Sequence, residues 1–250
     1  MKTCASSLLA LAAVLATALA APTPANGVSF PITDLLDKDL TVEEYAAQIE
    51  NQDVETRDLT KRQFSGDTYN QLTDGTACRR VTVIYARGTT QAGNVGEANS
   101  EGPTFFNALA SRVGGASNLA IQGVTYPANV IGFLAGGDAA GATTMFNLIN
   151  QAITRCPSTK IVVSGYSQGA QLVHTATQRL SASAASRVTA VVTFGDADRD
   201  ESFGSVAASK VLIICHAGDN ICDNGIIITP EHRNYEIDAP TAAAFVAARV

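Results

Sequence analysis

One serine of the chain has the surroundings of a nucleophile. The sequence GYSQG occupies residues 165–169, between a β-branched run at 160–164 and a segment of helical character at 168–180. A G-x-S-x-G pattern between a strand and a helix is typical of a nucleophile elbow, where the glycines permit a sharp turn and the serine oxygen stands above the sheet. The backbone N–H of Gln168 would face a carbonyl under attack, at the positive end of the helix. The pattern predicts Ser167 as a nucleophile and Gln168 as an oxyanion donor.

A serine nucleophile needs a base, and the chain contains three histidines. His232 follows both the serine and the candidate acids, which is the chain order Ser, Asp, His of α/β-hydrolases. His216 directly follows a predicted strand and is the weaker alternative. His174 lies inside the helix after the serine, where a packed structural histidine is expected. We therefore predict His232 as the base.

The acid that orients the base should lie between the serine and His232. Asp219 is enclosed by Cys215 and Cys222, and a disulfide between them would hold its loop rigid. Rigidity helps an acid that must keep an imidazole in one tautomer. Asp196, which follows the preceding predicted strand, is the alternative acid.

Strand-like and helical segments alternate along most of the chain after residue 63. The strand-like runs are apolar throughout, as in a parallel sheet covered on both faces. Ligands of such sheets bind beyond the carboxyl ends of the strands, where GYSQG lies. The predicted strands are 80–86, 119–124, 160–164, 188–194 and 210–215, and the predicted helices begin near residues 103, 136, 168 and 239.

The first 62 residues differ in composition from the rest. Residues 1–20 contain an apolar run that ends in Ala-Leu-Ala, as in a secretory signal peptide, and they are too short for a membrane span. Residues 21–62 hold nine acidic and four basic residues and end at Lys61-Arg62, which predicts an acidic propeptide or, alternatively, a linker. Residues 63–250 suit a single domain, and they carry no basic patch that would bind nucleic acid. We expect a secreted monomer.

The remaining cysteines fit an oxidising compartment. After removal of Cys4 with the signal peptide, four cysteines allow three pairings. Their proximity favours a bridge between Cys215 and Cys222, which leaves Cys78 and Cys156. The absence of a CxxC pair disfavours a zinc site, and we expect no metal or other cofactor.

Together these motifs resemble the fungal cutinase family. GYSQG resembles the elbow of that family, and Cys215 to Cys222 followed by His232 is similar to its C-x3-D-x2-C-x9-H signature, with every spacing kept. The loop at 85–90 resembles the family's oxyanion loop, and the helix at 241–246 its terminal helix. The resemblance implies a compact α/β-hydrolase with a five-stranded, mainly parallel sheet covered by helices on both faces and no large lid. It also implies the bridges Cys78–Cys156 and Cys215–Cys222.

The same resemblance implies the activity. Ser167, His232 and Asp219 would hydrolyse carboxylic esters, typically cutin polyester and short-chain esters, with Thr89 and Gln168 holding the oxyanion. One departure is Arg233, which stands beside the histidine where an apolar residue is usual, with Glu231 on the other side.

The candidate substrate rim is aliphatic. It comprises two runs of residues: Ile226, Ile227 and Ile228 before His232, and Val130, Ile131, Phe133 and Leu134 after the second strand. Such a rim suits a fatty-acid polyester, although the isoleucines could equally form a buried strand. Acetylxylan esterase activity is the alternative, disfavoured because the chain has no Trp and six Tyr. A binding protein with an inactive triad is a further alternative.

Overall fold

The computed structural model describes residues 27–50 and 63–250, so the predicted signal peptide, residues 21–26 and residues 51–62 with the Lys61-Arg62 site lie outside the described residues. At its centre is a five-stranded parallel sheet of order β3-β2-β4-β5-β6. The predicted α/β fold class is thus confirmed. The strands are β2 (Val81–Ala86), β3 (Leu119–Gly123), β4 (Lys160–Tyr166), β5 (Val188–Phe194) and β6 (Val211–Ile214).

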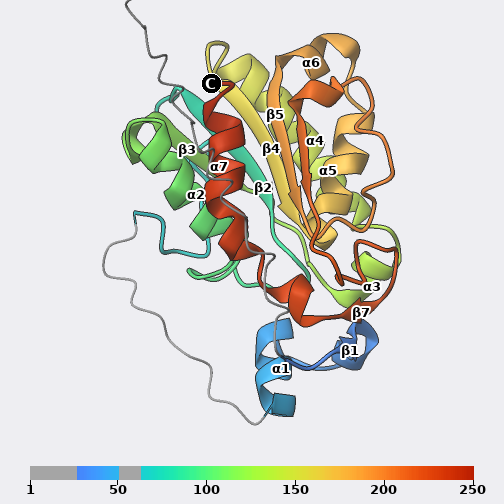
Figure 1. Cartoon of the computed structure of the whole chain (residues 1–250). Coiled ribbons are helices and arrows are strands. Elements are labelled where there is room, and N and C mark those ends of the chain that lie inside the picture. The colour runs from blue at the N-terminus through green and yellow to red at the C-terminus, as the bar shows by residue number, and fades with distance from the viewer. Residues whose placement is uncertain (1–26, 51–62) are drawn as a thin grey trace, which may run out of the picture.

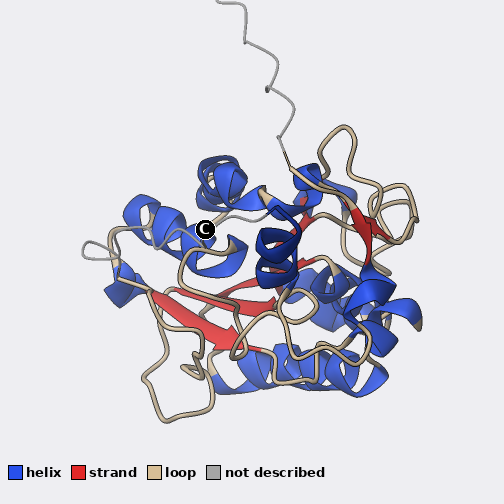
Figure 2. Ribbon diagram, turned by 90° about the horizontal axis from the view of Figure 1, so that it is seen from below, coloured by secondary structure: helices blue, strands red, loops and turns tan. Residues whose placement is uncertain are grey.

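Helices cover both faces of this sheet (Figure 2). On one face lie α4 (Ala139–Arg155), α5 (Gln168–Gln178) and α6 (Ala182–Arg187), and on the other α2 (Glu101–Arg112) and α7 (Ala239–Ala247). Their apolar side chains form one buried cluster on each face. The strands are apolar throughout because each of their two faces meets one of these clusters.

The helix predicted from residue 136 begins three residues later. Gly136 and Gly137 have φ of 81° and 101°, a left-handed conformation that no helix interior contains. The side chain of Asp138 then accepts a hydrogen bond of 2.6 Å from the N–H of Gly141 and caps the helix. The short helices α3 (Val130–Leu134) and α6 were not predicted.

Two disulfides connect distant and nearby parts of the chain. Cys78 is bonded to Cys156, at the end of the sheet where β2 begins, and Cys215 is bonded to Cys222. The first disulfide joins cysteines 78 positions apart in the sequence, and the second joins cysteines 7 positions apart. In the chain-entropy account the longer loop contributes more, roughly 4–5 kcal/mol.

Residues 27–50, which the sequence predicted as part of an acidic propeptide or linker, pack against residues 63–250, and we call them the cap. The cap contains β1 (Phe30–Pro31), the 3-10 helix η1 (Ile32–Leu35) and α1 (Val42–Glu50). Strand β1 pairs antiparallel with β7 (Ile227–Ile228). In Figure 1 the cap lies at the lower end of the molecule, beside β7 and α3, toward which the strands of the large sheet point.

A third buried apolar cluster joins the cap to the domain. Its members are Phe30, Ile32, Leu35, Val42 and Ala46 from the cap, and Val130, Phe133, Ala197, Ile221 and Ile228 from the domain. Among the described residues, none of the helices has the length and apolar character needed to span a bilayer.

Candidate active site

Ser167 occupies a strained turn between β4 and α5. Its φ of 54° and ψ of −122° place it in a region that non-glycine residues rarely adopt. Both glycines of GYSQG are needed by contact: a Cβ on Gly165 would lie 2.3 Å from the carbonyl oxygen of Gly169, and a Cβ on Gly169 would lie 2.1 Å from that of Ala86. The tight packing of α5 against the sheet therefore dictates the G-x-S-x-G pattern and lifts the serine out of the strand.

The structure brings Ser167, His232 and Asp219 together. Asp219 Oδ2 lies 2.8 Å from His232 Nδ1, and His232 Nε2 lies 3.0 Å from Ser167 Oγ. Because a carboxylate only accepts, Nδ1 carries the proton, and Nε2 is left to accept from the serine hydroxyl. All three residues are buried, with Ser167 only 3% exposed. This is the hydrogen-bond sequence of a Ser-His-Asp triad.

One tyrosine and one glycine hold His232 in place. The hydroxyl of Tyr166, within GYSQG itself, donates to the carbonyl oxygen of His232 at 2.8 Å, and the two rings stack at 5.2 Å. Gly195 has a φ of 55°, and a Cβ there would approach the imidazole of His232 to 2.8 Å. Sequence reasoning missed Tyr166, although its place beside the serine was a signal.

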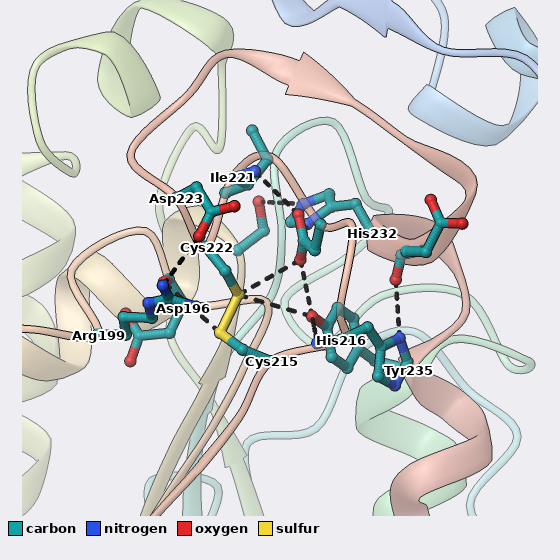
Figure 3. The surroundings of a disulfide bond; sticks show 12 residues. Asp196, Arg199, Cys215, His216, Ile221, Cys222, Asp223, His232 and Tyr235 are labelled. Atoms are coloured by element: carbon teal, nitrogen blue, oxygen red, sulfur yellow. Dashed lines mark hydrogen bonds and ion pairs between the residues drawn. A yellow bond between two sulfur atoms is a disulfide. The ribbon is translucent and has the colours of Figure 1, made fainter. Parts of the chain in front are cut away.

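Asp219 is fixed by a set of donors around its loop. Its Oδ1 accepts from the N–H of Ile221 at 2.9 Å, and its Oδ2 accepts from the hydroxyl of Tyr235 at 2.7 Å as well as from His232. The Cys215–Cys222 disulfide lies beside them (Figure 3). Burial alone would raise the pKa of the Asp219 carboxyl, but these hydrogen bonds and the charge of protonated His232 outweigh it and lower the pKa.

Tyr235 is a second residue that the sequence reasoning missed. Its ring is fully buried and stacks on His216 at 4.0 Å, and its hydroxyl accepts from the N–H of His216 at 2.8 Å while donating to Asp219. Tyr235 thereby connects the triad acid to the loop after β6. No local pattern marks this residue, because its partners are 16 and 19 residues away.

The predicted oxyanion residues face each other. Gln168 is the first residue of α5, and its Nε2 donates to Thr89 Oγ1 at 2.9 Å. Since Thr89 Oγ1 accepts this bond, its own hydrogen remains available to a substrate oxygen. The loop before it is held by Gln91, which accepts from the N–H of Gly88 at 2.8 Å and donates to the buried Glu101 at 2.8 Å.

The alternative acids and bases are engaged elsewhere. His174 Nε2 lies 3.0 Å from Asp196 Oδ2, and both side chains are buried under Phe203. His216 Nε2 lies 2.6 Å from Asp238. Neither histidine is bonded to Ser167, so the geometry favours His232 and Asp219 over them. Across residues 27–50 and 63–250, no group of His, Cys, Asp and Glu side chains is placed to bind a metal ion.

The predicted rim residues divide into exposed and covered ones. Leu134 and Ile226 are 47% and 41% exposed. Phe133 is buried in the cluster under the cap, and Ile227 pairs with Pro31 of the cap. Half of the expected substrate rim is therefore occupied by the chain itself.

The cutinase family profile matches residues 77–250, which include every residue of this site. The chain belongs to the cutinase family. Among cutinase relatives, the enzyme of Botryotinia fuckeliana is 48% identical over 170 residues, 68% of this chain and 83% of its own length. Cutinase CUT2 of Pyricularia oryzae is 46% identical over 197 residues, 77% of this chain and 90% of its own.

A solved cutinase structure agrees with this assignment. Trichoderma reesei cutinase, in complex with a C11Y4 phosphonate inhibitor, superposes with a TM-score of 0.70 at 39% identity, covering 87% of this chain and 89% of that one. An acetylxylan esterase superposes with a TM-score of 0.54 at 24% identity, covering 69% of this chain and 99% of that one, which shows a shared fold. As a member of the cutinase family, the protein is a carboxylic ester hydrolase.

Proposed function

We propose that the chain is a secreted serine esterase that hydrolyses cutin-type polyester and short-chain esters through Ser167, His232 and Asp219. The observation that carries the proposal is the continuous hydrogen-bond sequence from Asp219 through His232 to Ser167. The two disulfides and the apolar N-terminal run support secretion, since disulfides persist in oxidising compartments.

The chemistry proceeds in two steps. His232 Nε2 takes the proton of Ser167 as Oγ attacks the ester carbonyl, and the imidazolium is stabilised by Asp219. The N–H groups of Gln168 and Thr89, with the free hydroxyl hydrogen of Thr89, stabilise the oxyanion. The alcohol leaves with the proton from His232, and water, activated by the same imidazole, then hydrolyses the acyl-enzyme.

Hydrolysis of p-nitrophenyl butyrate by the wild type and by Ser167→Ala tests the activity. We expect the variant to lose at least about 10⁴-fold in kcat, since the nucleophile is removed while binding remains. Equal rates would refute an esterase centred on Ser167 and favour a binding protein.

The substrate class needs a separate comparison. The aliphatic rim favours a fatty-acyl polyester, whereas the likeness to acetylxylan esterase reaches only the fold. Release of hydroxy-fatty acids from cutin should exceed release of acetate from acetylated xylan at equal enzyme concentration. The opposite order would favour the acetylxylan esterase alternative.

A further inference from the structure

The cap contacts the chain on two sides of Ser167. Strand β1 pairs with β7, which directly precedes the turn carrying His232. The N–H of Val42 donates to Thr90 Oγ1 at 2.9 Å, next to the predicted oxyanion residue Thr89. The cap therefore bridges the two sides of the site at once.

The underside of the cap occupies the aliphatic rim. Phe30, Ile32 and Leu35 of the cap are buried together with Phe133 and Val130 of α3. These domain side chains belong to the surface on which the acyl chain of an ester would lie. Because packed interiors leave no room for both, the cap and an aliphatic substrate compete for one surface.

Arg233, which directly follows His232, connects the cap to the turn that carries the predicted base. Its Nη2 lies 3.0 Å from Glu50 Oε1, with the two side chains only 14% and 15% exposed. The same Glu50 oxygen accepts from the N–H of Val28 at 2.8 Å, and Arg233 Nη1 lies 3.7 Å from Glu43. Arg233 thus joins the beginning and the end of the cap to the turn that carries the base.

We propose that residues 27–50 close the substrate rim and must separate from the domain before an ester reaches Ser167, with the Arg233–Glu50 pair as the latch that sets the open fraction. The inference rests on the proposed role of Ser167 as nucleophile. Only the open fraction binds substrate, so KM varies inversely with that fraction. The triad itself is unchanged by opening, so kcat does not depend on the latch. Arg233 then determines how readily any ester gains access to Ser167.

A cross-link between β1 and β7 tests the closure directly. Pro31 lies opposite Ile227, and the adjacent hydrogen bond from Ile32 N–H to Ile226 O makes this a non-hydrogen-bonded pair. Such pairs have Cα atoms about 4.5 Å apart, within the range of a disulfide. Pro31→Cys combined with Ile227→Cys should therefore lock the cap when oxidised and release it when reduced.

The readout is the rate at which Ser167 reacts with diethyl p-nitrophenyl phosphate, in which a bond from Oγ to phosphorus forms and p-nitrophenolate leaves. We expect the oxidised full-length variant to lose this reaction and to regain it on mild reduction. Wild type exposed to the same reductant controls for the native disulfides. Equal rates in the oxidised and reduced forms would overturn the closure. If the reduced form and the wild type also fail to react at Ser167, the proposed function itself falls, and the closure with it.

The latch is tested by Glu50→Gln and Arg233→Leu. Losing an ion pair worth about 1 kcal/mol raises the open fraction about fivefold. Both variants should therefore lower KM for p-nitrophenyl butyrate about fivefold and leave kcat unchanged. Glu50 lies on the cap, away from the triad, which separates opening from any disturbance of His232. Arg199→Gln removes the exposed pair with Asp223 and serves as the matched control. An unchanged KM in Glu50→Gln would overturn the role of the latch.

Discussion

Substituting Tyr235 by Phe would test how far the triad acid depends on its surroundings. The change removes the hydroxyl that donates to Asp219 Oδ2 at 2.7 Å and keeps the buried ring stacked on His216. A hydrogen bond to a charged group is worth about 1.5–3 kcal/mol. Because His232 and the N–H of Ile221 still hold Asp219, we expect about half of this in the barrier, which lowers kcat/KM roughly tenfold.

The pH dependence of stability reports the same hydrogen bond independently of catalysis. The Tyr235 hydroxyl is one of the groups that lower the pKa of Asp219, so its loss raises that pKa. A lowered carboxyl pKa contributes stability above the pKa of the unfolded chain, and that stability disappears as the pH falls through the pKa of the folded state. Urea unfolding of Tyr235→Phe should therefore show a smaller loss of stability between neutral and acid pH than urea unfolding of the wild type.

The matched control for Tyr235→Phe is Tyr69→Phe, which removes a hydroxyl that accepts from the N–H of Gly66 far along the chain from the triad. It should leave kcat/KM and the pH dependence of stability unchanged. If Tyr235→Phe has the wild-type kcat/KM and the wild-type pH dependence of stability, the hydroxyl does not position Asp219 and the reasoning is refuted.

Three further predictions concern Glu101, the triad acid and the longer disulfide. Burial raises the pKa of Glu101 to about 8, so the folded state holds its proton more tightly than the unfolded chain does. The free energy of unfolding should therefore fall as the pH rises from 5 to 8, by up to about 1.4 kcal/mol per pH unit. In urea unfolding, this pH dependence should be weaker for Glu101→Gln than for the wild type, and an equal dependence would contradict the reasoning. Asp219→Asn should lower kcat by up to about 10⁴-fold, whereas Asp196→Asn should mainly lower the melting temperature, and the reverse result would reassign the acid. Replacing both Cys78 and Cys156 by Ser should cost roughly 4–5 kcal/mol of unfolding free energy without changing kcat, as measured by denaturant titration and assay of the folded protein.

The fold could be predicted, and the principal residues of the candidate site could be proposed, because each has a recognisable pattern in the sequence. The apolar runs give the parallel sheet, and the glycines of GYSQG are required by contacts of 2.3 Å and less that any such elbow makes. The predicted partners Asp219 and His232 lie 13 residues apart, and the cysteines mark the loop that contains the acid. Ser167 and His232 lie 65 residues apart, so it is the chain order Ser, Asp, His and the cysteines around Asp219, not short separation, that indicate these partners.

The cap could not be predicted from the same signals. Its acidic composition is typical of a propeptide, and the apolar residues Phe30, Ile32 and Leu35 are too few to indicate a packed element by periodicity. Their partners are roughly a hundred or more residues away in the chain, in α3 and β7. Long-range packing of this kind leaves no trace in a short sequence window, so composition indicated the acidic character of this segment but not its contacts with the domain.

The unusual residue beside the predicted base is explained by this packing. Arg233 stands where the family resemblance suggested an apolar side chain, and its side chain is 14% exposed. A guanidinium that is so nearly buried requires a counter-charge, and Glu50 supplies it from a position 183 residues earlier. An apolar residue at 233 would leave the Glu50 carboxylate partly buried with the Val28 N–H as its remaining partner. Arg233 and the acidic cap are therefore one structural feature, which the sequence presents as two unrelated departures.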